Sequence, residues 1–247
     1  MKRIPNWLLG VAVAITGVVH ASEQAHWSYA GETGPAHWGE LSKDYVACAA
    51  GKNQSPIDLA NMVEADMEPI SFIYRKVPLR VVNNGHTVQV DYPTGSQMFF
   101  TGHTYRLLQF HFHSPSEHHI QGKAYPLEAH LVHADNEGNL AVIAVMFTEG
   151  DDHPTIASVW THMPMKAGEK AAPAGLMVKV ADLFPANLEY YRYNGSLTTP
   201  PCTEGVRWMV LKRPVAVSTD QARRFRSLMH HDNNRPLQPV NNRPVLK

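Results

Sequence analysis

The sequence contains only two cysteines, no surplus of charge of either sign, and no apolar run as long as the roughly 20 residues that cross a bilayer. Its 22 basic residues equal its 22 acidic ones, so there is no standing positive field and we expect no nucleic-acid partner. The charged fraction of 18% and the hydrophobic fraction of 44% argue against a disordered, collagenous or coiled-coil chain. The composition is that of a folded globular protein.

The first 21 residues are predicted to be a secretory signal peptide. Lys2 and Arg3 precede 13 uncharged residues, 7–19, which are too few for a membrane span of about 20. Small residues at positions 19 and 21 suit a peptidase that cuts after Ala21, and an uncleaved anchor is the alternative. Cleavage would leave a mature chain, 22–247, with 20 basic and 22 acidic residues and no membrane span. We therefore expect a periplasmic or secreted protein.

Cys48 and Cys202 are the two cysteines, and an even number in an exported chain favours a disulfide. Two free buried thiols are the alternative. The cysteines are 154 positions apart, so the chain-entropy model gives a stabilisation of roughly 5 kcal/mol for closing that loop.

Short β-favouring runs alternate with turn residues, and no repeat, low-complexity tract or linker divides the mature chain. Asn84-Gly85 stands between the first two runs, where a tight hairpin turn favours these residues. Helical signals are few: Ser218 and Gln221 resemble a capping box, and apolar spacing over residues 156–163 predicts a second helix. The runs are residues 79–82, 87–92, 105–113, 129–133, 140–147 and 206–211. We expect a mainly β single domain with a mostly antiparallel central sheet and a few short peripheral helices.

Histidine is abundant, with 15 residues, and the most informative cluster lies in the run 107–113. The alternation of polar and aromatic residues places Gln109, His111 and His113 on one face of a strand and two phenylalanines on the other. Two imidazoles about 7 Å apart along one face can converge on a single ion. The phenylalanines would anchor the strand in a core.

A second run, residues 127–133, supplies a third ligand if its strand lies beside the first. Its alternation places Glu128, His130 and Val132 on one face. Three neutral imidazoles without a thiolate describe a catalytic zinc site, because the fourth tetrahedral position is left to water. Gln109 and Glu128 each precede a ligand by two positions and can accept a hydrogen bond from its other ring nitrogen.

The other histidine pairs, His118-His119 and His230-His231, lack this support, because adjacent strand residues face opposite ways. We interpret them as surface or packing histidines. A structural or accidental origin is also the alternative for an isolated His-x-His, but it leaves the second strand and both hydrogen-bond acceptors unexplained.

These segments, with a third that reads Gly-Ser-Leu-Thr-Thr-Pro-Pro from Gly195, resemble the signature segments of the α-class carbonic anhydrases. The resemblance covers essentially the whole mature chain. It is carried by Trp27, Tyr29, residues 54–58, residues 83–86, residues 109–113, residues 128–133, residues 195–201, Asn233 and Arg235-Pro236.

The resemblance implies a zinc enzyme that reversibly hydrates carbon dioxide to bicarbonate and a proton through zinc-bound hydroxide. Zn2+ would be held by His111, His113 and His130. Carbonic anhydrase is itself the standard example of such a site, with a bound water of pKa about 7. Thr198 matches the family's gating threonine, whose hydroxyl accepts from the hydroxide and donates to Glu117. His86 matches the proton-shuttle histidine.

Further positions are implied by the same resemblance. The apolar wall that receives carbon dioxide corresponds to Val132, Val142, Leu197, Val206 and Trp208, and Thr199 would line the anion-binding side. A purely structural interpretation makes the five apolar residues core residues. Tyr29, Asn84 and Gln89 match positions that order the waters leading to His86, and Asn233 matches a residue behind the ligands. Gln89 is longer than the asparagine of well-known vertebrate members.

The family's fold has a twisted, mainly antiparallel central sheet of about ten strands, in keeping with the pattern of β-favouring runs. Its exported members carry a disulfide at the positions of Cys48 and Cys202, and its bacterial members are often homodimers. The segment after His113 reaches Glu117 through only three residues, which resembles the compact bacterial branch and implies a more open rim.

Two other classes compete with this interpretation. In the cupins, a His-x-His-x3-Glu pattern binds a metal on a β-barrel, and Glu117 would then be a ligand. An exported zinc-binding or storage protein could also be rich in histidine, but it would need neither an apolar wall nor a relay from Thr198 to Glu117.

Overall fold

The computed structural model describes residues 25–247 of the chain. The predicted signal peptide, residues 1–21, lies outside the described residues. In the part of the chain that is described, no helix has both the length and the apolar character needed to span a membrane.

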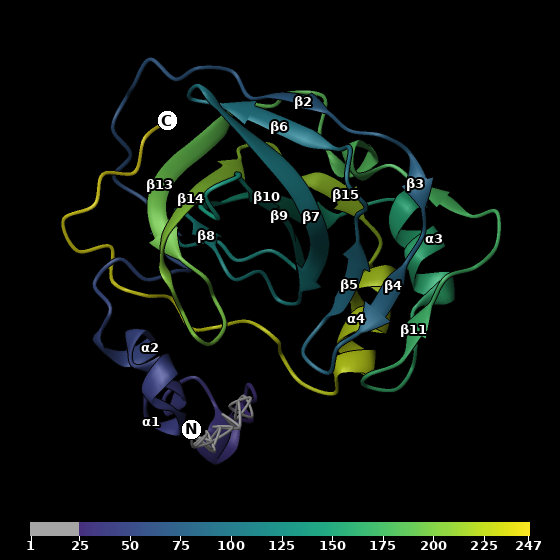
Figure 1. The fold of residues 1–247 in the computed structure, drawn as a ribbon, viewed down its shortest axis with the longest axis horizontal. Helices are drawn as coiled ribbons and strands as arrows, with labels where there is room; N and C mark the ends of the chain where they lie inside the picture. The colour runs from purple at the N-terminus through teal and green to yellow at the C-terminus, as the bar shows by residue number, and fades with distance from the viewer. Residues whose placement is uncertain (1–24) are drawn as a thin grey trace, which may run out of the picture.

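Eleven strands of the described chain form one large sheet (Figure 1). Its main path runs β11-β4-β5-β7-β9-β10-β14-β13, with β2 and β6 joined through β7 and with β15 beside β10. The strands are β2 Ser71–Ile73, β4 Val81–Asn83, β5 Val88–Asp91, β6 Gln97–Phe100, β7 His103–His113, β9 Leu127–Ala134, β10 Leu140–Glu149, β11 Lys170–Ala171, β13 Tyr190–Ser196, β14 Glu204–Leu211 and β15 Val215–Val217.

Neighbouring strands are antiparallel except where β10 meets β14 and β15 in parallel. Two small sheets pair β1 (Asp58–Leu59) with β8 (His119–Ile120) and β3 (Val77–Pro78) with β12 (Met177–Val178). The predicted mainly β fold with a mostly antiparallel sheet of about ten strands is therefore confirmed.

Each of the six predicted strands has a counterpart, in β4, β5, β7, β9, β10 and β14. The predicted hairpin is the connection between β4 and β5, residues 84–87. Gly85 has a φ of +86°, a left-handed conformation that glycine adopts without a Cβ clash. The Asn84 backbone N–H donates to the Thr87 carbonyl, so Gly85 and His86 form the tip of the hairpin.

Strand β7 changes its buried face halfway along, which its sequence pattern did not predict. Tyr105 and Leu107 are buried in the larger core cluster, and so are Phe110 and Phe112, although odd and even positions should face opposite ways. A register shift against β9 between Leu107 and Gln109 accounts for this. Such a bulge inserts one unpaired residue and exchanges the two faces.

The core occupies both faces of the sheet. Strand β10 shows the division: Ala141, Ile143 and Val145 belong to one cluster, whereas Val142 and Ala144 belong to the other. Every one of these side chains is buried. The β-favouring run of residues 140–147 is therefore part of a strand that is buried on both faces.

Two helices pack behind β7, α3 (Pro154–His162) and α4 (Thr219–Met229). Ser218 and Gln221 form the predicted capping box at the start of α4. The Trp160 ring of α3 stacks on Phe225 of α4 and meets Phe112 of β7 edge-on, with centroids 4.7 Å apart. Shorter helical segments, which have too few residues for a periodicity signal, are η1 Gly31–Thr33, α1 Trp38–Leu41, η2 Lys43–Tyr45, α2 Ala47–Ala50 and η3 Val180–Leu183.

Candidate metal centre

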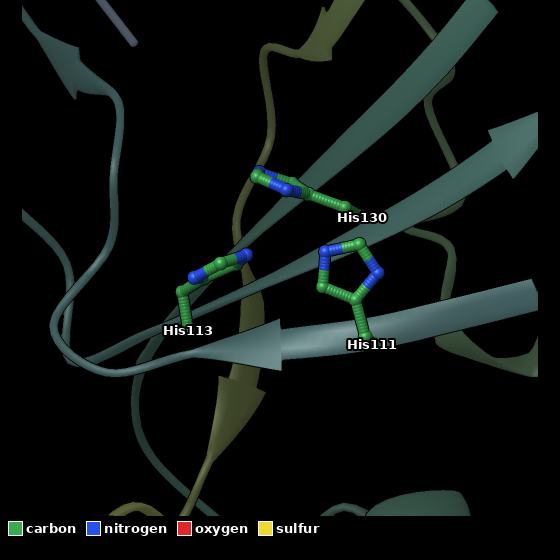
Figure 2. A group of neighbouring side chains, drawn as sticks. All are labelled: His111, His113 and His130. Carbon is green, nitrogen blue, oxygen red and sulfur yellow. The ribbon is translucent and has the colours of Figure 1, made fainter. Parts of the chain in front are cut away.

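Three imidazoles from two neighbouring strands converge (Figure 2). His111 and His113 project from β7, and His130 lies opposite His111 in the ladder with β9. Their ring centroids are 4.6–5.3 Å apart, and one nitrogen of each ring lies within 4.8 Å of the others. His113 and His130 are buried, whereas His111 is partly exposed, so solvent has access from its side. The alternation predicted from sequence thus places the three rings together.

A hydrogen bond to the opposite side of each ring fixes its tautomer. Nδ1 of His111 donates to Gln109 Oε1 over 2.8 Å, and Nε2 of His130 donates to Glu128 Oε1 over 2.6 Å. Nδ1 of His113 donates to the backbone carbonyl of Asn233 over 2.7 Å. The three remaining nitrogens keep their lone pairs facing one another. Among the described residues the buried Nε2 of His113 has no hydrogen-bond partner.

Glu128 organises the side of the site behind His130. Besides His130, its carboxylate accepts from Nδ1 of His118 over 2.7 Å and from the backbone N–H groups of Glu117 and His118. Burial alone would raise the pKa of Glu128, but the electrostatic interactions and hydrogen bonds that its carboxylate makes with His118 and His130 hold this pKa well below its ordinary value. The carboxylate therefore remains charged at neutral pH.

The electrostatics of the three rings suit a cation at their centre. Burial, together with the neighbouring imidazoles, lowers the pKa of His111 well below its ordinary value and lowers that of His113. For His130, burial acts in the same direction, but the charges of Glu128 and Glu117 and the Glu128 hydrogen bond raise the pKa. Two neutral rings and one ring beside carboxylates form a donor set that favours a positive ion.

Glu117 lies at the edge of the three rings. Its Oε2 is 3.5 Å from Nε2 of His113 and 3.8 Å from Nδ1 of His130, and Oε1 accepts from the backbone N–H of Arg235 over 2.8 Å. Oε2 is buried and has no hydrogen-bond partner within residues 25–247. Thr198 is buried as well, but no hydrogen bond joins it to Glu117 among these residues. The relay between them stays a prediction.

The five residues of the predicted apolar wall belong to one hydrophobic cluster. Val142, Val206 and Trp208 are buried in it, and Val132 and Leu197 pack against it. The Trp208 ring centroid lies 4.8 Å from that of His130, so the wall borders the convergent rings. The interpretation as core residues is thus correct for Val142, Val206 and Trp208. It is compatible with a role at the site.

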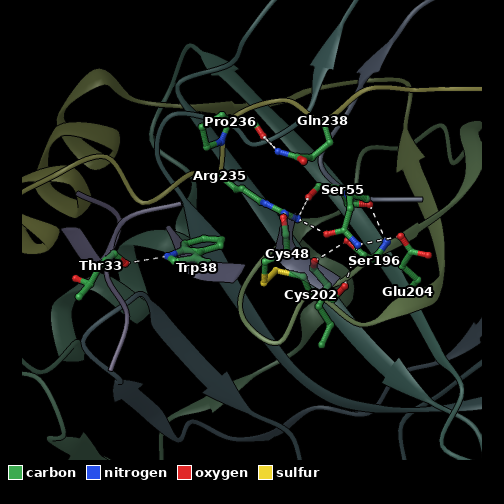
Figure 3. Close-up of a disulfide and its surroundings, with 12 residues drawn as sticks. Thr33, Trp38, Cys48, Ser55, Ser196, Cys202, Glu204, Arg235, Pro236 and Gln238 are labelled. Atoms are coloured by element: carbon green, nitrogen blue, oxygen red, sulfur yellow. Dashed lines mark hydrogen bonds between the residues drawn. A yellow bond between two sulfur atoms is a disulfide. The ribbon is translucent and has the colours of Figure 1, made fainter. Parts of the chain in front are cut away.

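The predicted disulfide between Cys48 and Cys202 is present (Figure 3). It anchors the segment that carries Thr198 and Thr199. The Cys202 backbone N–H donates to the Thr199 carbonyl over 2.8 Å. The buried guanidinium of Arg235 donates to the Cys48 carbonyl, so it links α2 to the residue whose N–H binds Glu117. A disulfide is typical of exported proteins.

His86 lies at the tip of the β4–β5 hairpin and stacks flat on Trp27, with centroids 3.7 Å apart and planes 8° apart. It is half-buried. Burial and the charges of His26 and His231 lower its pKa from the ordinary value of 6.5.

The three predicted water-ordering residues lie around the same hairpin. Tyr29 meets the His86 ring edge-on, with centroids 6.5 Å apart. Asn84 uses its side-chain oxygen to accept from the N–H groups of His86 and Thr87, so that oxygen shapes the turn. Gln89 lies opposite His111 in the ladder between β5 and β7 and donates to Asp91 over 2.6 Å.

The role of His118 was not predicted from the sequence. Its ring is fully buried and bridges Glu128 to the Tyr193 hydroxyl, which is 2.6 Å from Nε2. The packing interpretation was correct for burial, but it did not predict this polar network. No local signal could have found it, because Tyr193 is 75 residues away and His118 lies between strands. The sequence also gave no indication that Trp27 stacks on His86.

Known proteins are similar to this chain in fold and in sequence. A profile described as eukaryotic-type carbonic anhydrase matches residues 33–247. A carbonic anhydrase of Pectobacterium atrosepticum is 45% identical over 226 residues, 92% of each chain, and one of Neisseria gonorrhoeae is 41% identical over 248 residues, all of this chain and 97% of the relative. The α-carbonic anhydrase of Thermovibrio ammonificans, solved with sulfanilamide, superposes with a TM-score of 0.89 at 48% identity, covering 91% of this chain and all of that one.

The fold and the three-histidine cluster define a mainly β metalloenzyme. The chain belongs to the α-class, or eukaryotic-type, carbonic anhydrase family, whose general reaction is the hydration of carbon dioxide. The alternatives of a cupin and of a zinc-storage protein are therefore wrong.

Proposed function

We propose that the protein hydrates carbon dioxide reversibly at a single Zn2+ held by His111, His113 and His130. The observation that carries this proposal is the buried, unpartnered Nε2 of His113, which faces two further imidazoles whose other nitrogens are engaged. An all-imidazole donor set of three with solvent access on one side suits zinc with an open position. Zinc bound there would act as a Lewis acid and lower the pKa of a water molecule to about 7, the value known for this enzyme class.

The chain's own residues complete the site. The wall around Trp208 offers apolar contact to an uncharged, linear gas, and its position beside His130 puts that contact next to the reacting atoms. Glu117 has a free carboxylate oxygen to accept from the Thr198 hydroxyl, which would orient that hydroxyl. Thr199 would line the side that binds bicarbonate.

His86 would carry the released proton to solvent. A half-buried imidazole with a lowered pKa is neutral at pH 7 and is therefore able to accept a proton. Tyr29, Asn84 and Gln89 would order the water between His86 and the metal.

His130→Ala tests the proposal. Because two imidazoles hold the ion poorly, we expect the variant to lose zinc and activity together, as measured by metal analysis and stopped-flow hydration of carbon dioxide. His103→Ala, at the exposed start of β7, is the matched control and should retain both. A wild-type protein whose hydration rate is unchanged by removing all metal would reject the proposed function.

We further propose that residues 22–247 are the mature domain, that it is periplasmic or secreted, and that it forms a homodimer. The disulfide supports export. Sedimentation of the purified mature protein tests the homodimer.

A further inference from the structure

The hairpin that carries His86 is fastened to the strand that carries two of the candidate ligands. The Thr87 hydroxyl donates to the backbone carbonyl of Phe112 over 2.5 Å and accepts from the Phe112 N–H over 3.2 Å. Phe112 stands between His111 and His113 in the sequence of β7. Thr87, the residue after His86, therefore binds both backbone groups of the residue that separates two candidate ligands.

Asn233 makes a second connection between the hairpin and Phe112. Its Nδ2 donates to the carbonyls of both His86 and Phe112, each over 3.0 Å. Its Oδ1 accepts from the Ser114 N–H over 2.8 Å. The same residue's backbone carbonyl accepts from His113, so its position is fixed on the ligand side as well.

These bonds are shielded from water, because Thr87 is 6% exposed and Asn233 is 0% exposed. A buried polar group that loses its partner carries a desolvation cost, so the connections resist displacement. They are also not needed to form the hairpin tip, whose N–H groups are bound by the side chains of Asn83 and Asn84. What they fix is the position of the tip relative to β7.

We propose that Thr87 and Asn233 are positioning residues that set the distance between His86 and the metal-binding histidines. We call this pair the Phe112 clamp. The proposal rests on the proposed function, in which His86 transfers the proton. Transfer over a short chain of waters depends steeply on geometry, and a misplacement of about 1 Å can cost on the order of a hundredfold in rate.

Thr87→Val removes the hydroxyl at nearly constant volume. At low buffer concentration, where proton transfer limits turnover, we expect kcat to fall about tenfold, less than complete loss of an acid–base group costs. kcat/KM for carbon dioxide should stay within about twofold, because hydration itself does not use the shuttle. Thr87→Ser keeps the hydroxyl and should restore kcat. Thr161→Val is the matched control, since it removes an exposed hydroxyl that donates only to Ala157 within α3.

A double-mutant cycle separates positioning from general damage. In a His86→Ala background, Thr87→Val should cause no further loss of kcat, because the group that it positions is gone. Added imidazole should restore part of the lost turnover in either single variant. Two results would overturn the clamp: equal losses of kcat and kcat/KM in Thr87→Val, or a full Thr87→Val effect in the His86→Ala background. Either would mean that the hydroxyl supports the strand that carries the metal ligands and does not position His86.

A readout independent of activity is the NMR signal of the His86 ring in metal-free protein. The clamp predicts that Thr87→Val alters this signal and its titration, whereas Thr87→Ser and Thr161→Val do not. If the wild-type protein fails to hydrate carbon dioxide, the proposed function is wrong, and an unaltered His86 signal in Thr87→Val rejects the clamp in its own right. Should Thr87→Val not fold, Thr87→Ala leaves room for a water at the polar site and serves the same comparison.

Discussion

At the scale of the residue, function depends on what each side chain contacts rather than on its type. His86, His118 and His133 illustrate this: one is half-buried on Trp27, one bridges Glu128 to Tyr193, and one lies in the core. From the sequence, His86 is assigned by resemblance and His118 is assigned to the surface or to packing. Only the structure separates the half-buried ring of His86 from the fully buried bridge made by His118.

Replacing His86 by alanine should keep zinc but slow turnover. Within residues 25–247 the ring packs on Trp27 and Tyr29 and makes no hydrogen bond to a candidate ligand, so metal content should equal that of the wild type. Turnover at low buffer should fall by about a hundredfold, the lower range for loss of an acid–base group. Stopped-flow hydration with increasing imidazole should show partial rescue, and wild-type turnover without imidazole would refute the shuttle assignment.

At the scale of the element, local backbone features decide which side chains share a face. The bulge in β7 returns Phe110 and Phe112 to the core side that Leu107 occupies, and it thereby directs Gln109, His111 and His113 to the opposite face. Without that shift, the ligands would lie on the face of Leu107. The spacing of the histidines is visible in the sequence, but the bulge depends on pairing with β9.

Strand β13 makes a close approach that requires glycine. A Cβ at Gly195 would overlap the Ser55 hydroxyl and would lie 2.8 Å from the Tyr193 ring. The hydroxyl cannot move freely, since it bonds the Tyr193 hydroxyl and accepts from the Ser196 N–H. Gly195→Ala should therefore lower the free energy of unfolding by about 1–3 kcal/mol, as measured by denaturant unfolding.

The Ser55→Ala/Gly195→Ala double variant provides the control for this contact. Because the smaller residue 55 removes one of the two clashes, adding Gly195→Ala to Ser55→Ala should cost less than adding it to the wild type. Strictly additive losses would show that the Ser55 hydroxyl is not the obstacle.

At the scale of the whole molecule, one covalent link joins the N-terminal helices to the loop that carries Thr198. Replacing Cys48 and Cys202 by serine should lower the free energy of unfolding by up to roughly 5 kcal/mol, the chain-entropy value for a sequence separation of 154. Denaturant unfolding of the variant and the oxidised wild type measures the difference. The intact mass of unreduced wild-type protein should be two hydrogens below the reduced mass, and equal masses would reject the bridge.

Stability should fall in mild acid because of His133. Its Nε2 accepts from the Tyr74 hydroxyl over 2.6 Å, and burial lowers its pKa from 6.5 to about 4. The unfolded chain gains a proton at this site below pH 6.5, whereas the folded protein resists it until about pH 4. This difference stabilises the folded protein by about 3 kcal/mol. The stabilisation is complete above pH 6.5 and is lost as the pH falls to about 4.

Urea unfolding at pH 7.5 and pH 5 tests this dependence. His133→Gln should flatten the change in stability between the two pH values, although it destabilises the protein at both. The exposed His103→Gln should leave the wild-type difference unaltered. An equal pH dependence in wild type and His133→Gln would show that other groups cause the acid loss.

The sequence by itself determined the mainly β class, six of the strands, the capped helix α4, the disulfide and the alternation that brings His111, His113 and His130 together. These features follow from local periodicity, or from a residue pattern that the chain shares with its family. The tertiary structure alone decided the β7 bulge, the His118 bridge, the stacking of His86 on Trp27 and the Phe112 clamp. Each of these depends on atoms far apart in the chain, whose meeting is set by strand register and burial rather than by neighbouring residues.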